Sequence, residues 1–417
     1  MTQNLQKILL INDFEKGGGA EKVFTQTYEL LLNNKIIADK FVGDLEHSKL
    51  NSSFNSLTTL SIIKTISRVY SYKNYIKLQD VLHKLKPDVI HLHNYYSSLS
   101  PSILMAIRTY RKSCLKIKVI FTAHDYHLLC PFSSFMFYSF FKNTVNYLTS
   151  PPNIFKSVFY KWDSRGFPYS LIKKIQWINA YVINDYHKEI DHIVTPSFFL
   201  ADFFKHKFTD IPISVVRNPF VNKNLLNVSV CNIIKSNTLK LVYVGRLSPE
   251  KGLIEFIQNL KLIDSINYTF KIIGDGQLKR SILRVIDDYN LGDKVIVLGE
   301  MRHQEVLNEL SVNDALVLPS LCYENAPLSL VEGAFMNLRL ITANYGGMKE
   351  IAELCGGEYL MDPSNFASVR EAVVTCYNDI ISGVPMINRD LKMLNNLFSE
   401  ENYLNSLFDV YERTKER

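Results

Sequence analysis

The feature that most constrains the fold of this chain is an alternation of short buried strands with amphipathic helices, which occurs in both halves of the sequence. KILLIND near the start is typical of a buried strand, and GGGAEKVFTQTYELLLNN is typical of a glycine loop that leads into a helix. Further strands are predicted at DVIHLHN, KVIFTAH and HIVTPS, and later at LKLVYVGRLSPEKG, YTFKIIGDG, KVIVLGE, DALVLPS and RLITANYGG. Such alternation predicts mostly parallel sheets that are covered by helices on both faces.

The length of the chain indicates that this pattern is divided between two domains. A chain of 417 residues is too long for one ordinary hydrophobic core. The segment around 214–238 has the Asn, Pro and Ser content of a connector. We therefore predict an α/β protein with two doubly wound, Rossmann-like domains, 1–217 and 218–395, that face a cleft. A final amphipathic helix over 396–417 could pack back on the first domain, with Tyr403, Leu407 and Val410 on one face.

The composition narrows the class of protein. No apolar run approaches the ~20 residues that a membrane span needs, and no leader peptide is recognisable, so we expect a soluble cytoplasmic protein. Six cysteines are scattered without a Cys-x-x-Cys pair, so neither a zinc knuckle nor a disulfide framework is predicted. The formal charge of +6 favours anionic partners such as phosphates or a membrane surface, and no nucleic acid is expected.

The loop VGRLSPEKG is a candidate diphosphate site. Gly245 ends a predicted strand, Arg246 follows it directly, and Lys251 precedes Gly252 and a helix that begins near Leu253. Ligands of doubly wound sheets bind outside the carboxyl ends of the strands. Two cations beside a helix start with unpaired backbone N–H groups are suited to a diphosphate. The alternative is that these are solvated loop charges.

Two glutamates lie after the predicted strand ALVLP. Pro327 suits the first turn of a helix, so Glu324 is expected in the loop above the strand and Glu332 in the second helical turn. A carboxylate can accept hydrogen bonds from both hydroxyls of a vicinal diol, and a nucleotide sugar has such diols at both ends. The two glutamates could therefore hold one donor, with its diphosphate between them on Arg246 and Lys251.

These motifs resemble those of a known family. GRLSPEKG, then Glu, seven residues and Glu, then GGMKEI, is similar to the signature of retaining glycosyltransferases of family 4, which have the GT-B fold. GGGAEKV, HDYHLLCP and IIGDGQL are similar to family motifs in order and spacing. The chain departs from the family at RNPF, where Asn-Gly is usual, and at Asn337 and Arg339, where Gly and Pro are usual. Asn tolerates the left-handed conformation that a helix end often needs.

The resemblance implies roles for individual residues. Glu332 would bind the donor ribose, and Glu324 would contact hydroxyls of the transferred sugar. His124 would face that sugar from the opposite wall. The implied catalytic residues are His124, Glu324, Arg246 and Lys251. The implied nucleotide-sugar site consists of Gly18, Gly19, Gly245, Arg246, Lys251, Glu324, Asn325, Ala326, Pro327, Leu328 and Glu332.

The predicted mechanism does not use a metal. The chain has no Asp-x-Asp, the usual short signature of metal-assisted sugar transfer, so Arg246 and Lys251 would stabilise the departing diphosphate. We expect no cofactor and no metal site, and a UDP-sugar donor rather than a GDP-sugar. Retention of configuration, by attack on the same face, is what the family implies.

Histidines form a second candidate cluster. His91 and His93 lie in IHLHN, and His124 and His127 lie in HDYH. Such spacings can serve metal sites, but no cysteine or carboxylate set completes one at a familiar spacing. The alternative for these side chains is that they are buried and hydrogen-bonded.

The segment from about 132 to 175 is rich in both aromatic and basic residues, and we predict a helical insertion. Aromatic bodies with basic heads suit the interface of an anionic membrane, which would help an enzyme that acts on a lipid-linked acceptor. Peripheral contact with the inner face of the membrane is therefore one hypothesis, and internal packing of the aromatics is the other. The aromatic residues are Phe135, Phe137, Tyr138, Phe140, Phe141, Phe155, Phe159, Tyr160 and Trp162, and the basic residues are Lys142, Lys156, Lys161, Arg165, Lys173 and Lys174.

The sequence thus predicts a retaining hexosyltransferase that moves a sugar from a nucleoside diphosphate sugar to a saccharide acceptor, in the synthesis of capsule, O-antigen or exopolysaccharide. Two other enzymes with the GT-B fold are alternatives. An epimerase would need no saccharide acceptor, and a phosphorylase would need free phosphate. A non-catalytic nucleotide-sugar-binding protein is the third possibility.

Overall fold

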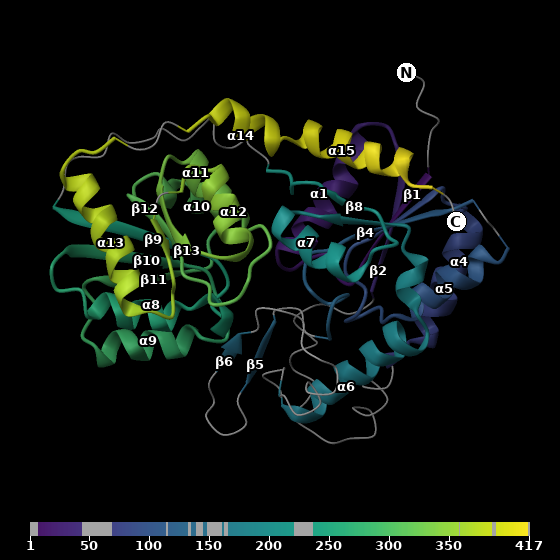
Figure 1. Cartoon of the computed structure of the whole chain (residues 1–417), viewed down its shortest axis with the longest axis horizontal. Coiled ribbons are helices and arrows are strands. Elements are labelled where there is room, and N and C mark those ends of the chain that lie inside the picture. The colour runs from purple at the N-terminus through teal and green to yellow at the C-terminus, as the bar shows by residue number, and fades with distance from the viewer. Residues whose placement is uncertain are drawn as a thin grey trace. The chain divides into compact units, whose positions relative to one another are not determined.

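The computed structural model describes residues 7–43, 69–113, 116–131, 135–138, 145–147, 161, 166–220, 237–357, 359–385 and 389–415. Contacts divide the chain into two compact units (Figure 1). The N-terminal unit consists of Met1–Pro219 and Glu400–Arg417, and the C-terminal unit consists of Phe220–Ser399.

The N-terminal unit is built on a six-stranded parallel sheet in the order β2-β1-β3-β4-β7-β8. Because β2 and β3 lie on opposite sides of β1, the winding reverses between β1 and β3, which is where ligands of such sheets bind. The strands are β1 (Lys7–Asn12), β2 (Ile37–Val42), β3 (Val89–Leu92), β4 (Lys118–Thr122), β7 (His192–Thr195) and β8 (Ile213–Val215).

Helices cover this sheet, and α4 packs against α5 (Figure 1). The helix α6 continues directly into a π-helical turn over Asn179–Ile183. The helices are α1 (Gly19–Asn33), α4 (Tyr72–Leu85), α5 (Ser102–Arg111), α6 (Phe167–Ile178), α7 (Phe198–Lys207) and α15 (Glu400–Arg413).

The C-terminal helix α15 completes the core of the N-terminal unit, where it packs beside α1. Tyr403, Leu407 and Val410 are at most 4% exposed, which confirms the predicted buried face. Hydroxyl groups add to this packing, since the Tyr403 hydroxyl lies 2.6 Å from Thr27 Oγ1. Near the end of the helix, Lys118 Nζ donates to the Tyr411 carbonyl oxygen over 2.7 Å.

The C-terminal unit has a second six-stranded parallel sheet, in the order β11-β10-β9-β12-β13-β14. Its winding reverses between β9 and β12. Its strands are β9 (Thr238–Val244), β10 (Asn267–Ile273), β11 (Val295–Gly299), β12 (Ala315–Leu318), β13 (Arg339–Ala343) and β14 (Tyr359–Met361).

The helices of this unit follow the apolar spacing of the sequence. In α8, Leu253, Phe256, Ile257 and Leu260 are buried at the spacing of one helical face. Among the described residues, no helix has the length and apolar character that a membrane crossing requires. The helices are α8 (Leu253–Lys261), α9 (Lys279–Asp288), α10 (His303–Leu310), α11 (Leu328–Phe335), α12 (Gly346–Leu354), α13 (Phe366–Ile381) and α14 (Leu391–Leu397).

The two parallel sheets confirm the predicted doubly wound α/β class, and each strand motif named above forms a strand. Asn337 has a φ of 58°, which confirms the expectation that an asparagine at this helix end adopts the left-handed conformation. The predicted connector begins too early, because Ile213–Val215 still pairs with β7 as the edge strand β8.

The prediction of a helical insertion over 132–175 is wrong in part. Met136–Tyr138 (β5) and Val145–Tyr147 (β6) form an antiparallel pair, as suits short segments with aromatic and β-branched residues. Only the last part of the segment, from Phe167, is helical in the described part of the chain. Most of the aromatic and basic residues of the membrane hypothesis lie outside the described residues.

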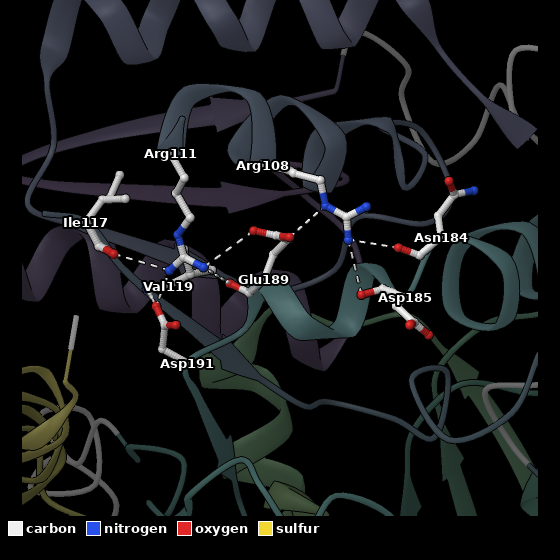
Figure 2. A network of polar contacts seen from close by, with 8 residues as sticks. All are labelled: Arg108, Arg111, Ile117, Val119, Asn184, Asp185, Glu189 and Asp191. Carbon is white, nitrogen blue, oxygen red and sulfur yellow. Dashed lines mark hydrogen bonds and ion pairs between the residues drawn. The ribbon is translucent and has the colours of Figure 1, made fainter. Parts of the chain in front are cut away.

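A network of charged side chains joins α5 to the amino ends of β4 and β7 (Figure 2). Arg108 Nε donates to Glu189 Oε1 over 2.7 Å, and Arg111 pairs with both Glu189 and Asp191. Asp191 Oδ2 also accepts from the Val119 backbone N–H over 2.8 Å. The network lies at the edge opposite the carboxyl ends of the strands, so its role is to fix α5 on the sheet.

Candidate active site

The loop after β9 is held against the loop after β12 at the point where the winding of the C-terminal sheet reverses. Gly252 ends the short 3-10 turn Pro249–Lys251 with a φ of +64°. A Cβ atom at this position would lie 2.2 Å from the Pro319 carbonyl oxygen, so only glycine allows the two loops to approach. The close packing brings Lys251 to the residues that follow β12.

Lys251 and Glu324 form an ion pair at this place. Lys251 Nζ lies 2.9 Å from Glu324 Oε2, and the side chains are 18% and 13% exposed. Ser320 Oγ donates to the other carboxylate oxygen of Glu324. Burial disfavours the charged amine, but the neighbouring Glu324 carboxylate outweighs this effect and raises the pKa of Lys251. The sequence placed both residues in one site, and the structure brings them into contact.

Arg246 lies in the same loop but is largely exposed. Its Nη2 atom donates to Glu250 Oε1 over 2.8 Å, and the arginine side chain is 65% exposed. Ser248 Oγ donates to the same oxygen over 2.6 Å. Burial of Glu250 acts to raise its pKa, but attraction to Arg246 and the bond from Ser248 lower it overall. Glu250 therefore orients the exposed arginine, a role that the sequence analysis missed.

The residues that follow Glu324 lead into α11. Pro327 precedes the helix, Leu328 begins it, and Glu332 lies in its second turn with 7% exposure, as the spacing predicted. Asn325 and Ala326 are half-buried in the loop. The carbonyl oxygen of Glu324 accepts from the Gly347 N–H over 2.7 Å, which ties this loop to the start of α12.

In the N-terminal unit, the predicted glycine loop connects β1 to α1. Gly18 and Gly19 are exposed, and α1 begins at Gly19. The Gly18 N–H donates to Glu21 Oε2 over 2.8 Å, so the first turn of the helix is capped by its own glutamate. The loop lies at the carboxyl end of β1, beside the reversal point of this sheet.

Three histidines meet near the carboxyl ends of β3 and β4, with His91 inside β3 and the other two after the strands. His91 is buried between the hydroxyls of Tyr411 and Thr122, each 2.7 Å from a ring nitrogen. His93 Nδ1 lies 2.8 Å from His124 Nε2. Burial lowers the pKa of His124 to about 4, so its ring is neutral at pH 7. In the described part of the chain, no group of three or more His, Cys, Asp or Glu side chains could hold a metal ion.

His93 determines which ring nitrogen of His124 carries the proton. His93 is buried, and its Nε2 atom has no hydrogen-bond partner among the described residues. If His124 donated through Nε2, His93 would have to keep a proton on that unpaired nitrogen. A buried N–H without a partner is rarer than an unpaired acceptor. We therefore assign the proton of His124 to Nδ1, which makes this ring a hydrogen-bond donor whose basic nitrogen is engaged by His93.

Comparisons with known proteins agree with the motifs and the fold. The model of the family described as "Glycosyltransferase Family 4" matches residues 18–221, and the model "Glycosyl transferases group 1" matches residues 232–380. Together they span most of both units. The chain belongs to the family 4 glycosyltransferases, with the GT-B fold.

One relative and several solved structures match this glycosyltransferase along nearly its whole length. The UDP-Gal:alpha-D-GlcNAc-diphosphoundecaprenol alpha-1,3-galactosyltransferase of Escherichia coli is 24% identical and covers 94% of this chain and 93% of its own. Sucrose-phosphate synthase from Thermosynechococcus elongatus has a TM-score of 0.65 at 16% identity, with 98% of each chain covered. HepE of Anabaena in complex with UDP has a TM-score of 0.60 at 15% identity and covers 97% and 99%. At these identities the solved structures support the fold alone.

The sequence analysis of the glycosyltransferase missed an acidic residue beside His124. Asp125 Oδ2 accepts from the Tyr96 hydroxyl, and Asp125 Oδ1 accepts from the His127 N–H over 2.9 Å. The Tyr96 and His127 rings are stacked with centroids 3.5 Å apart. Trp177 Nε1 of α6 donates to the His127 carbonyl oxygen over 2.8 Å. The only signal in the sequence is that Asp125, like His124, lies within three residues of the end of a strand.

Within the described part of the aromatic and basic segment, aromatic rings pack internally. Phe135 is 0% exposed and stacks on Tyr126 with ring centroids 3.9 Å apart. Lys174 is also buried, and burial lowers its pKa to about 8. Phe135 and Lys174 therefore agree with the hypothesis of internal packing. For the other residues of the segment, contact with a membrane stays a prediction.

Proposed function

We propose that this glycosyltransferase transfers a hexose from a UDP-sugar to a lipid-linked saccharide, with retention of the anomeric configuration, in the synthesis of a bacterial surface polysaccharide such as capsule, O-antigen or exopolysaccharide. The name of the E. coli relative supports a diphosphate-linked lipid acceptor and a UDP donor, and the HepE complex supports UDP. Such an acceptor would bring the enzyme to the inner face of the cytoplasmic membrane.

The observation that carries the proposal is the Lys251–Glu324 pair at the reversal point of the C-terminal sheet. A diphosphate placed there would meet the Lys251 ammonium and the exposed guanidinium of Arg246. Glu324 would then accept hydrogen bonds from hydroxyls of the transferred sugar, while Glu332 accepts from the ribose. One loop and one helix start thus provide groups for both ends of the donor.

In the proposed mechanism, the bond between the sugar and the diphosphate breaks while the acceptor hydroxyl attacks from the same face. Negative charge grows on the departing diphosphate, and cations already fixed in place stabilise it without reorganisation. His124 would donate a hydrogen bond through Nδ1 and would not act as a base, because His93 engages its other nitrogen. The proton of the acceptor hydroxyl would pass to the leaving phosphate oxygen.

The first test measures nucleotide binding. UDP at ~100 times its dissociation constant should stabilise the protein by about 2.7 kcal/mol in a thermal unfolding assay, whereas GDP, ADP and NAD should have smaller effects.

Lys251→Ala should abolish this UDP-induced shift and reduce transfer on the order of 100-fold or more. Activity should persist in a chelator, because cations of the protein replace the metal.

Lys271→Ala is the matched control. Lys271 Nζ lies 2.7 Å from Glu309 Oε2, so this variant also breaks a partly buried Lys–Glu pair of the C-terminal unit. It should lower stability to a similar extent and leave the UDP-induced shift intact. If both variants respond to UDP alike, the diphosphate site is misplaced. Consumption of a UDP-sugar without any acceptor would instead favour an epimerase.

A further inference from the structure

The N-terminal unit has two carboxylates near the carboxyl ends of its strands, with similar chemistry and different surroundings. Asp13 follows β1, and Asp125 follows β4 beyond His124. Burial raises the pKa of each carboxyl group to about 6. Since burial has the same effect on both, the difference between them lies in the groups that donate hydrogen bonds to each carboxylate.

Both carboxylate oxygens of Asp13 accept hydrogen bonds from backbone N–H groups. Its Oδ2 accepts from the Ser97 N–H over 2.9 Å, and its Oδ1 accepts from the Ser98 and Leu99 N–H groups over 2.7 and 2.8 Å. The residue is 1% exposed. These bonds hold the loop that follows β3, so the role of Asp13 is structural.

The Asp125 carboxylate has unused hydrogen-bond acceptor positions. Each of its oxygens accepts one hydrogen bond, from Tyr96 and from His127, although an ionised carboxylate offers about four acceptor positions. No ion pair to Asp125 is present among the described residues, and Lys173 acts on it only through longer-range attraction. A carboxylate with so little compensation is costly to bury unless a ligand supplies donors. The residue is only partly buried, so a ligand can reach it.

The position of Asp125 matches a ligand site. It follows β4, which pairs with β3, and β3 borders the reversal point of the sheet. Ligands of doubly wound sheets bind at this edge. The position of Asp125 makes it a functional candidate, and the perturbed pKa of its carboxyl group supports the same conclusion. His124 next to it is a donor, so the two residues offer complementary groups to a hydroxyl.

We propose that Asp125 binds a hydroxyl group of the saccharide acceptor, with its carboxylate accepting a hydrogen bond and the Tyr96 hydroxyl holding that carboxylate in place. The ligand class is a neutral sugar hydroxyl. Asp125 orients the acceptor and takes no part in bond breaking. This inference rests on the proposed function, since it assigns the acceptor side of the same reaction.

The test compares Asp125→Asn with Asp13→Asn in the full chain. The probe is N-acetylglucosamine diphosphate on a short alkyl chain, and three quantities are measured: equilibrium binding of the probe, the UDP-induced thermal shift and the acceptor KM. Asp125→Asn should weaken probe binding and raise the acceptor KM by roughly tenfold or more, with UDP binding unchanged within about twofold. Asp13→Asn should lower the unfolding temperature and leave probe affinity unchanged.

Tyr96→Phe provides a second variant in case Asp125→Asn does not fold. It removes one donor to the carboxylate and keeps the stacked ring, so it should weaken probe binding by a smaller factor, about threefold. If Asp125→Asn leaves probe affinity and acceptor KM unchanged, or weakens UDP and probe equally, the inference is wrong. Probe binding that depends on Asp125 without any transfer would retain the site and refute the proposed reaction. A wild-type protein that does not bind the probe would overturn the inference.

Discussion

Among single residues, the placement of Glu324 depends on a glycine from a different loop. Gly347 donates its N–H to the Glu324 carbonyl oxygen, and a Cβ atom on Gly347 would lie 1.7 Å from the Asn325 carbonyl oxygen. Gly347→Ala must therefore displace the loop that carries Glu324. We expect UDP affinity to fall by roughly tenfold or more and stability to fall by about 1–3 kcal/mol. Thermal unfolding with and without UDP measures both effects.

Gly292→Ala is a suitable control for this prediction, because a Cβ atom at Gly292 meets no atom within 4 Å. It lies in the same unit and should change neither stability nor the UDP shift. A Gly347→Ala protein that responds to UDP like the wild type would show that the position of Glu324 tolerates movement of its loop.

Position along a strand was sufficient to predict part of the candidate site. Lys251, Glu324 and Glu332 each lie where the strand and helix pattern placed them, because motif spacing follows from the local structure. Partners of side chains were not predictable in the same way. Glu250 and Asp125 depend on the course of loops that meet in three dimensions, which local periodicity does not encode.

Among whole elements, α15 is the one whose place the sequence left open. The sequence predicted its apolar face, but it did not predict which apolar surface of the protein that face would pack against. In the structure Leu407 is 0% exposed in the core that α15 shares with α1. The antiparallel pair β5–β6 was missed for a related reason, since the aromatic segment has no period that separates a strand from a buried helix.

Leu407→Ala tests the contribution of α15 to the N-terminal unit. Removing a fully buried leucine side chain should lower the free energy of unfolding by about 2–5 kcal/mol, because the cavity cannot close completely. Urea unfolding followed by tryptophan fluorescence measures this change. Asp409→Ala alters the same helix at a side chain that is 63% exposed and should have little effect. Equal stability of the two variants would contradict the packing of α15 on this core.

At the scale of the whole molecule, titratable histidines are distributed unevenly between the units. The chain has 10 histidines, and all but His303 precede residue 220. Burial lowers the pKa of six of them. The effect is large for five, to about 3 for His91 and to about 4 for His124 and His192, with His93 and His127 also well below the ordinary value, and it is smaller for His187. His303, in the C-terminal unit, is only partly buried. The two units should therefore respond differently to acid.

Acid should unfold the N-terminal unit first. Below pH 6.5 the unfolded chain binds a proton at each of these five histidines and the folded chain does not, so stability falls as the pH falls. Asp13 and Asp125 act in the opposite direction between about pH 6 and 4, because their raised pKa values let the folded state bind protons first. The difference of about three protons near pH 5 corresponds to a slope of about 4 kcal/mol per pH unit.

Tryptophan fluorescence isolates this transition, because Trp162 and Trp177 both belong to the N-terminal unit. Urea midpoints at pH 7, 6 and 5 should fall steadily for the fluorescence signal, while the UDP-induced shift reports on the C-terminal unit. His91→Gln should reduce the slope by about 1.4 kcal/mol per pH unit, since one proton no longer distinguishes the folded from the unfolded state. A fluorescence midpoint that does not change between pH 7 and 5 would mean that these histidines are protonated in the folded protein, and the assignment of a neutral His124 ring would fail with it.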